Sequence, residues 1–150
     1  MRENVMIIPI DKTNIDQAAR IHSESWRESH RLFCSEEFVS LHTPEHQREY
    51  LQKKLDAGSA LFMLVDKEPV GIVSVNGSMI EDLYVLPDKQ RKGYGSALLE
   101  FAISKCDGTP TLWILENNSA AEEFYLAAGF KRSGRVDASR RIAEVELVLL

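Results

Sequence analysis

Residues 83–97 read LYVLPDKQRKGYGSA, and this stretch decides the fold of the chain. An apolar run ends at Pro87, charged residues follow, and two glycines then precede an amphipathic helical pattern. The segment therefore predicts a strand, a turn and a helix N-terminus in succession. Unpaired N–H groups and the positive end of the helix dipole make a helix N-terminus an anion site. Lys89, Arg91 and Lys92 add positive charge, so we expect a phosphate-bearing ligand here.

Two common phosphate-binding loops are excluded by the residues that follow. The dinucleotide fingerprint GxGxxG would need a third glycine where Leu98 stands. The sequence contains no GxxxxGK[ST] segment, so a P-loop is excluded as well.

The rest of the chain alternates between strand and helix signals. Apolar runs predict strands over 5–10, 61–65, 70–75, 79–86, 111–115, 130–136 and 142–150. Apolar residues recur at helical spacing after Thr13, Thr43, Gly95 and Asn118, and each of these segments is predicted to be a helix. Ser35 is a further candidate for the start of a helix. Asn76-Gly77 is a hairpin turn signal, and Gly58 is expected to end the helix that Thr43 and Pro44 begin. The predicted order is β-α-α-β-β-β-α-β-α-β-β, an α/β (α+β) fold with a mixed, largely antiparallel sheet of about seven strands and about four helices.

Composition limits the class of protein. The chain has 150 residues, 44% hydrophobic and 27% charged, which is typical of one globular domain over 1–150. No apolar run is long enough to span a membrane and no secretory leader is evident, so we expect a cytoplasmic protein. The net charge of −5 disfavours nucleic acid as the main partner. Cys34 and Cys106 are distant thiols, and no disulfide is expected.

Two motifs carry a family resemblance. Gln90, Gly93 and Gly95 match the Gln/Arg-x-x-Gly-x-Gly/Ala pyrophosphate loop of the GNAT superfamily of acetyl-CoA-dependent N-acetyltransferases. Residues 118–130, NSAAEEFYLAAGF, resemble that superfamily's Asn-x-x-Ala-x-x-Phe-Tyr-x-x-x-Gly-Phe element. Two motifs in the right order on the expected elements are more specific than either alone. The resemblance covers the whole chain and is sharpest from residue 80 to 130.

The resemblance implies a binding mode for acetyl-CoA. The backbone of the strand ending at Val85 would pair with the pantetheine arm, and amides from Lys92 to Ser96 would hold the pyrophosphate. Asn118 would bind near the pantetheine, and Phe124 is expected to be a packing residue. The implied cofactor-binding residues are Leu83, Tyr84, Val85, Gln90, Arg91, Lys92, Gly93, Tyr94, Gly95, Ser96, Asn118 and Tyr125.

The same resemblance implies the chemistry. The Val85 N–H would polarise the acetyl carbonyl, and Tyr125 would protonate the departing thiolate. Regular strand alternation would place Glu81 on the same face as Leu83 and Val85, with Asp82 on the other face. Glu81 is then a candidate to take the amine proton, directly or through water. A water molecule acting without a dedicated side chain is the alternative.

The acceptor pocket is expected between the first two helices, with Trp26, His30 and Phe33 as candidate substrate-binding residues. His22, on the same apolar helical face, is expected to be a packing residue. No metal site is expected at His42 and His46, because Pro44 interrupts their spacing and no third ligand is evident.

The function implied is transfer of an acetyl group from acetyl-CoA to a primary amine of a small molecule or peptide. The alternative is a non-catalytic module that binds acyl-CoA and regulates a partner. Homodimers are common in this superfamily, and the apolar segment 145–150 offers a surface for one.

Overall fold

The computed structural model describes residues 5–139 and 142–150. Seven strands form one sheet in the order β1-β2-β3-β4-β5-β7-β6, and only the β4–β5 pair is parallel. The elements are β1 Val5–Pro9, α1 Ile15–His30, α2 Glu36–Ser40, α3 Pro44–Asp56, β2 Ala60–Asp66, β3 Glu68–Asn76, β4 Met79–Val85, the 3₁₀ turn η1 Pro87–Lys89, α4 Tyr94–Lys105, β5 Thr111–Leu115, α5 Ser119–Ala127, β6 Lys131–Asp137 and β7 Glu144–Val148.

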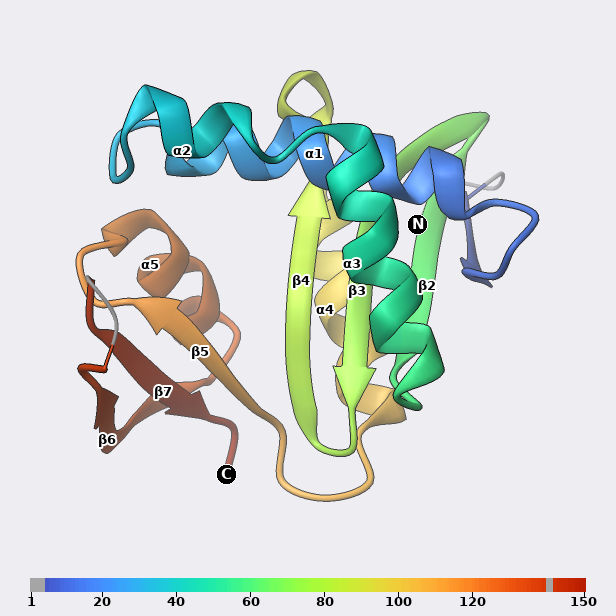
Figure 1. Ribbon diagram of the computed structural model, residues 1–150. Coiled ribbons are helices and arrows are strands. Elements are labelled where there is room, and N and C mark those ends of the chain that lie inside the picture. The colour runs from blue at the N-terminus through green and yellow to red at the C-terminus, as the bar shows by residue number, and fades with distance from the viewer. Residues whose placement is uncertain (1–4, 140–141) are drawn as a thin grey trace.

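Helices cover both faces of the sheet around β3 and β4 (Figure 1). On one face, apolar residues of α1 and α3 such as Ile15 and Leu51 pack with Met63 and Ile72 of the strands. On the other face, Leu98 of α4 is fully buried in a second cluster, against which α5 also packs. This arrangement confirms the expected mixed, largely antiparallel sheet. No helix in the described part of the chain is both long and apolar enough to cross a membrane.

Helix ends follow the capping signals with one exception. Ser35 and Thr43 accept hydrogen bonds from the third residue of α2 and α3, and α3 ends before Gly58, whose φ is +97°. The short α2 adds a fifth helix to the expected four. The prediction for Thr13 is wrong, because its hydroxyl is bonded to Asp11 and the cap position falls on Asn14.

We expect Thr43→Ala to lower the free energy of unfolding by about 1 kcal/mol, because it leaves an N–H of the first turn of α3 without its acceptor. Thr13→Ala is the matched control, since Thr13 caps no helix, and should change it by no more than about 0.5 kcal/mol. Urea denaturation measures both. Equal losses in the two variants would contradict the capping role.

Candidate active site

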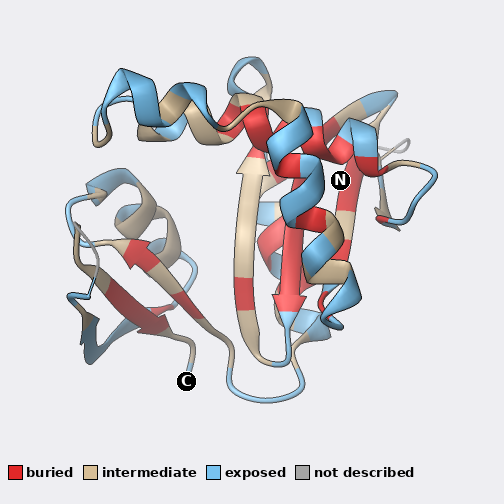
Figure 2. Cartoon of the chain, viewed as in Figure 1, coloured by how far each residue is buried: buried red, intermediate tan, exposed pale blue. Residues whose placement is uncertain are grey.

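Strands β4 and β5 part immediately after they meet. The parallel pairing is limited to Met79 and Thr111, and the two strands diverge beyond it (Figure 1). Although β4 is the central strand, residues 81–84 are only partly buried, as its largely tan colour in Figure 2 shows. The outer edge of β4 therefore lacks a neighbouring strand along most of its length, so its peptide groups are available to an extended ligand.

A β-bulge in β4 decides which peptide groups face this gap. Asp82 has a φ of +52°, and the register with β3 shifts between Glu81 and Tyr84, so Asp82 and Leu83 lie together opposite Val73. Beyond the bulge, the Leu86 N–H donates to Val70 of β3 at 2.9 Å. Because antiparallel residues alternate in direction, the N–H groups of Leu83 and Val85 point away from β3 and into the gap.

The bulge also corrects the prediction for Glu81. Leu83 and Val85 pack on the α4 side of the sheet, whereas the Glu81 and Asp82 carboxylates both contact Lys54 on the α3 side. Glu81 therefore does not share a face with Leu83 and Val85. Regular alternation fails here because the extra residue shifts all later side chains by one position.

The loop 90–96 has the features of an anion site. Gly93, with a φ of +87°, is the N-cap of α4, and this cap has no side-chain hydrogen bond and no acidic residue in the turn that follows. The first backbone bond within the helix is from Ala97 to Gly93, so the N–H groups of Gly95 and Ser96 are available to a ligand.

The side chains of this loop divide into two groups. Arg91 and Lys92 are exposed beside the free amides. The Gln90 amide donates to the Val85 carbonyl at 3.2 Å, which ties the loop to the edge of β4. The Tyr94 ring is buried in the core and its hydroxyl bonds Asp66, so its side chain is a packing group rather than a ligand contact.

Helix α5 lies at the other side of the gap. Asn118 caps α5 by accepting a hydrogen bond from Ala121 at 3.2 Å, which uses only the oxygen of its amide. Phe124 packs against the core, and a Cβ on Gly95 would lie 3.5 Å from its ring, which confirms its expected packing role. Tyr125 contacts the rings of Phe124 and Phe130.

Two tyrosines approach the gap from opposite sides. Burial raises the pKa of Tyr125 to about 12. Burial also raises the pKa of Tyr84 on β4 well above its usual value, and the charges of Asp82, Tyr125 and Glu144 add to this effect. Both phenols therefore stay protonated at neutral pH.

Trp26 and His30 are brought together at the end of α1. Their rings stack with centroids 4.0 Å apart, and His42 stacks on the other side of Trp26. None of the ring contacts among residues 5–139 and 142–150 includes Phe33, which follows α1 in a turn. His22 is buried, as expected of a packing residue, and its Nδ1 lies 2.6 Å from the Gln47 amide.

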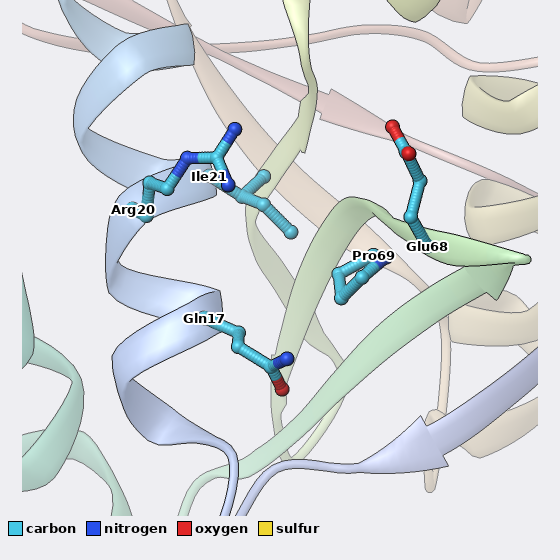
Figure 3. Close-up of a pocket in the computed structure, with 5 residues that line it drawn as sticks. All are labelled: Gln17, Arg20, Ile21, Glu68 and Pro69. Carbon is cyan, nitrogen blue, oxygen red and sulfur yellow. The ribbon is translucent and has the colours of Figure 1, made fainter.

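A separate hollow lies between α1 and the start of β3, as Figure 3 shows. Its lining consists of Gln17, Arg20, Ile21, Glu68 and Pro69. None of these residues belongs to the loop 90–96 or to the edges of the gap. In the described part of the chain, no three His, Cys, Asp or Glu side chains are grouped to hold a metal ion.

The sequence reasoning missed a polar cluster beneath the bulge, made by the largely buried Lys54, Ser74 and Asp82 and the more exposed Tyr50. Lys54 and Asp82 are 28 residues apart, so no local motif joins them. The available signal was the helical spacing of Gln47, Leu51 and Lys54, which places a lysine on the buried face of α3.

Comparisons with known proteins agree with this geometry. The sequence matches the family model of the acetyltransferase (GNAT) domain over residues 16–149. The peptidyl-lysine N-acetyltransferases YjaB of Salmonella typhimurium and Escherichia coli are 37% and 35% identical to it over 68 residues. Each alignment covers 45% of this chain and 46% of the relative, so the chain matches less than half the length of these proteins.

Solved structures extend the likeness to nearly the whole chain. The PaiA N-acetyltransferase of Thermoplasma acidophilum, in complex with coenzyme A, has a TM-score of 0.73 at 18% identity, covering 95% of this chain and 97% of that one. The apo form of YjaB from Escherichia coli has a TM-score of 0.69 at 23% identity, covering 97% of both chains. These structures show a shared fold. With a family model that matches residues 16–149, the chain belongs to the GNAT acetyltransferase family.

Proposed function

We propose that this protein is a single-domain N-acetyltransferase that transfers the acetyl group of acetyl-CoA directly to a primary amine. The observation that carries the proposal is the unpaired Val85 N–H at the parted edge of β4, linked by Gln90 to the uncapped N-terminus of α4. One long ligand with an anionic end and an amide-bearing arm would use both features.

The residues of the chain have distinct parts in this reaction. The amides of residues 92–96 would bind the pyrophosphate, with Arg91 and Lys92 beside it. The Leu83 and Val85 peptide groups would pair with the pantetheine arm, and the Val85 N–H would polarise the acetyl carbonyl. Trp26, His30 and Phe33 are the proposed acceptor-binding residues. Trp26 and His30 would contact the acceptor directly, and Phe33 would lie at the edge of the acceptor site.

The proton balance involves two side chains. The amine nitrogen attacks the acetyl carbon, the carbon–sulfur bond breaks, and the Tyr125 phenol donates a proton to the leaving thiolate. Glu81 does not share the face of Leu83 and Val85, but its side chain is 31% exposed on the side of β4 that faces α3, and from there it would take the amine proton through a water molecule. The alternative is proton loss directly to solvent, without Glu81.

The acceptor class is suggested by the relatives. The YjaB proteins are named peptidyl-lysine N-acetyltransferases, which supports a lysine side chain in a peptide as the first acceptor to test. A cytoplasmic location, a homodimer and the absence of a nucleic-acid partner stay predictions from the sequence.

The proposal is tested by incubating the purified protein with acetyl-CoA and lysine peptides, polyamines, amino acids or peptide N-termini, one at a time. We expect release of free thiol and an acetylated amine detected by mass spectrometry. Binding of coenzyme A without turnover on any amine would favour the non-catalytic module. Failure to bind coenzyme A would contradict both readings.

A further inference from the structure

The polar cluster beneath the β4 bulge is fixed by contacts from two elements outside the gap. Lys54 of α3 lies 3.0 Å from the Glu81 carboxylate and 3.1 Å from Ser74 Oγ, and it also bonds Asp82. The Tyr50 hydroxyl donates to Asp82 at 3.0 Å. Lys54 and Asp82 are only 13% and 12% exposed, so this is an internal ion pair.

The cluster also holds the backbone of the bulge. Ser74 Oγ lies 2.9 Å from the Asp82 carboxylate and 3.1 Å from the Glu81 carbonyl oxygen. Asp82 is not a glycine, yet its φ is +52°, a conformation that persists only where surrounding contacts impose it. Lys54, Tyr50 and Ser74 all bond the Asp82 carboxylate, so its side chain is held in place at the bulge.

The bulge in turn determines the edge that faces the gap. Asn76 pairs with Met79 across the two-residue turn at Gly77 and Ser78, so a regular strand would direct every second residue from Met79 onward toward β3. Leu83 and Val85 would then bond to β3 and present no N–H to a ligand. The extra residue at Asp82 reverses this direction for both of them.

We propose that Lys54 is a positioning residue for acetyl transfer, because its pairing with Asp82 holds the bulge that directs the Val85 N–H into the gap. This inference rests on the proposed function. Lys54 bonds both the Asp82 and the Glu81 carboxylates, and the positioning of the Val85 N–H is transmitted through Asp82 and the backbone of β4.

The charges around Asp82 add a pH signature. Lys54 and Tyr50 face it from α3, Glu81 and Tyr84 flank it on β4, and His22 of α1 places Nε2 3.6 Å away. Burial opposes ionisation of Asp82, but His22 and Lys54 hold its pKa well below the usual value. Without the positive charge of Lys54, the effect of burial on the pKa of Asp82 is less fully offset. The pKa of the Asp82 carboxyl would then rise, and the group would take up a proton at higher pH.

The test compares Lys54→Met with Lys53→Met, the same change at the exposed neighbouring position of α3. We expect Lys54→Met to lower kcat about 10-fold while the Kd of coenzyme A changes less than about threefold, because the pyrophosphate loop is untouched. The pH below which its kcat falls should also be higher than in Lys53→Met, because Asp82 takes up a proton at higher pH; both variants lose rate at low pH as the acceptor amine becomes protonated. A kcat equal to that of Lys53→Met, or a lower kcat with the same pH dependence as Lys53→Met, would overturn the inference.

A second variant keeps the inference testable if Lys54→Met does not fold. Lys54→Met/Asp82→Asn leaves no unpaired charge at these two positions, and we expect a low kcat with the same pH dependence as Lys53→Met. Wild-type kcat in this double variant would overturn the inference.

A binding measurement separates this inference from the proposed function. In ¹⁵N-labelled protein, acetyl-CoA should shift the Val85 amide signal in wild type and Lys53→Met but not in Lys54→Met. Equal shifts in all three would overturn the role of Lys54, whatever the turnover. Absence of turnover in wild type, with these shifts as expected, would overturn only the proposed function.

Discussion

Tyr125→Phe should lower kcat for acetyl transfer about 100- to 1,000-fold, the usual effect of removing a general acid. Proton transfer to the sulfur as the carbon–sulfur bond breaks releases coenzyme A as the neutral thiol and so assists its departure. Tyr125 supplies a neutral phenol on the α5 side of the gap, and its ring is held by contacts with Phe124 and Phe130. Removing one oxygen leaves those contacts in place, so the Kd of coenzyme A should change less than about twofold.

The pH dependence gives an independent check on Tyr125. Burial raises the pKa of the Tyr125 phenol to about 12, so in the folded protein the phenol keeps its proton at any pH well below that value. The donor is lost only as the pH rises toward that value, so kcat of the wild type should show no alkaline fall from this group below about pH 10. A kcat that fell with an apparent pKa near 8 would mean that another group supplies the proton.

Tyr84→Phe is the matched variant, because it removes the same hydroxyl from the opposite side of the gap. Tyr84 packs on the α1 and α3 side of β4, with its ring 5.1 Å from His22. We expect a loss in kcat of less than about 10-fold, since Tyr84 is assigned no proton transfer. A larger loss in Tyr84→Phe than in Tyr125→Phe would assign the donor to β4 instead.

The sequence predicted those parts of the fold that local rules control. The limits of α3 follow from Thr43, Pro44 and Gly58, each of which acts on its own turn of backbone. The β3–β4 hairpin follows from Asn76-Gly77 for the same reason. The short motif around Gly93 was readable because a helix start, a left-handed glycine and the absence of acid are all local features.

The bulge was not predictable, because its cause is a set of contacts distant in sequence. The segment around Asp82 reads as a regular strand, and nothing within it requires an extra residue. The conformation of Asp82 depends on Lys54 in α3 and Ser74 in β3. The face assigned to Glu81 was therefore wrong.

Gly93→Val should weaken binding of coenzyme A about 10- to 100-fold, as expected when one or two charge-assisted hydrogen bonds are lost. A Cβ at Gly93 would meet no atom within 4 Å, so the substitution causes no clash. Its effect comes from φ, which is +87° and strains any β-branched residue. Relief of that strain rotates the peptide groups that start α4, and the amides of Gly95 and Ser96 then no longer point at one anion.

Gly58→Val separates loss of the anion site from loss of stability. Gly58 also has a positive φ, +97°, and open space where a Cβ would stand, but it follows α3 away from the loop. Both variants should lose about 1–2 kcal/mol of unfolding free energy from the same backbone strain. Only Gly93→Val should raise the Kd measured by titration calorimetry with coenzyme A. If both variants bound coenzyme A equally well, the N-terminus of α4 would not be the pyrophosphate site, and the gap at β4 would have to bind its ligand without it.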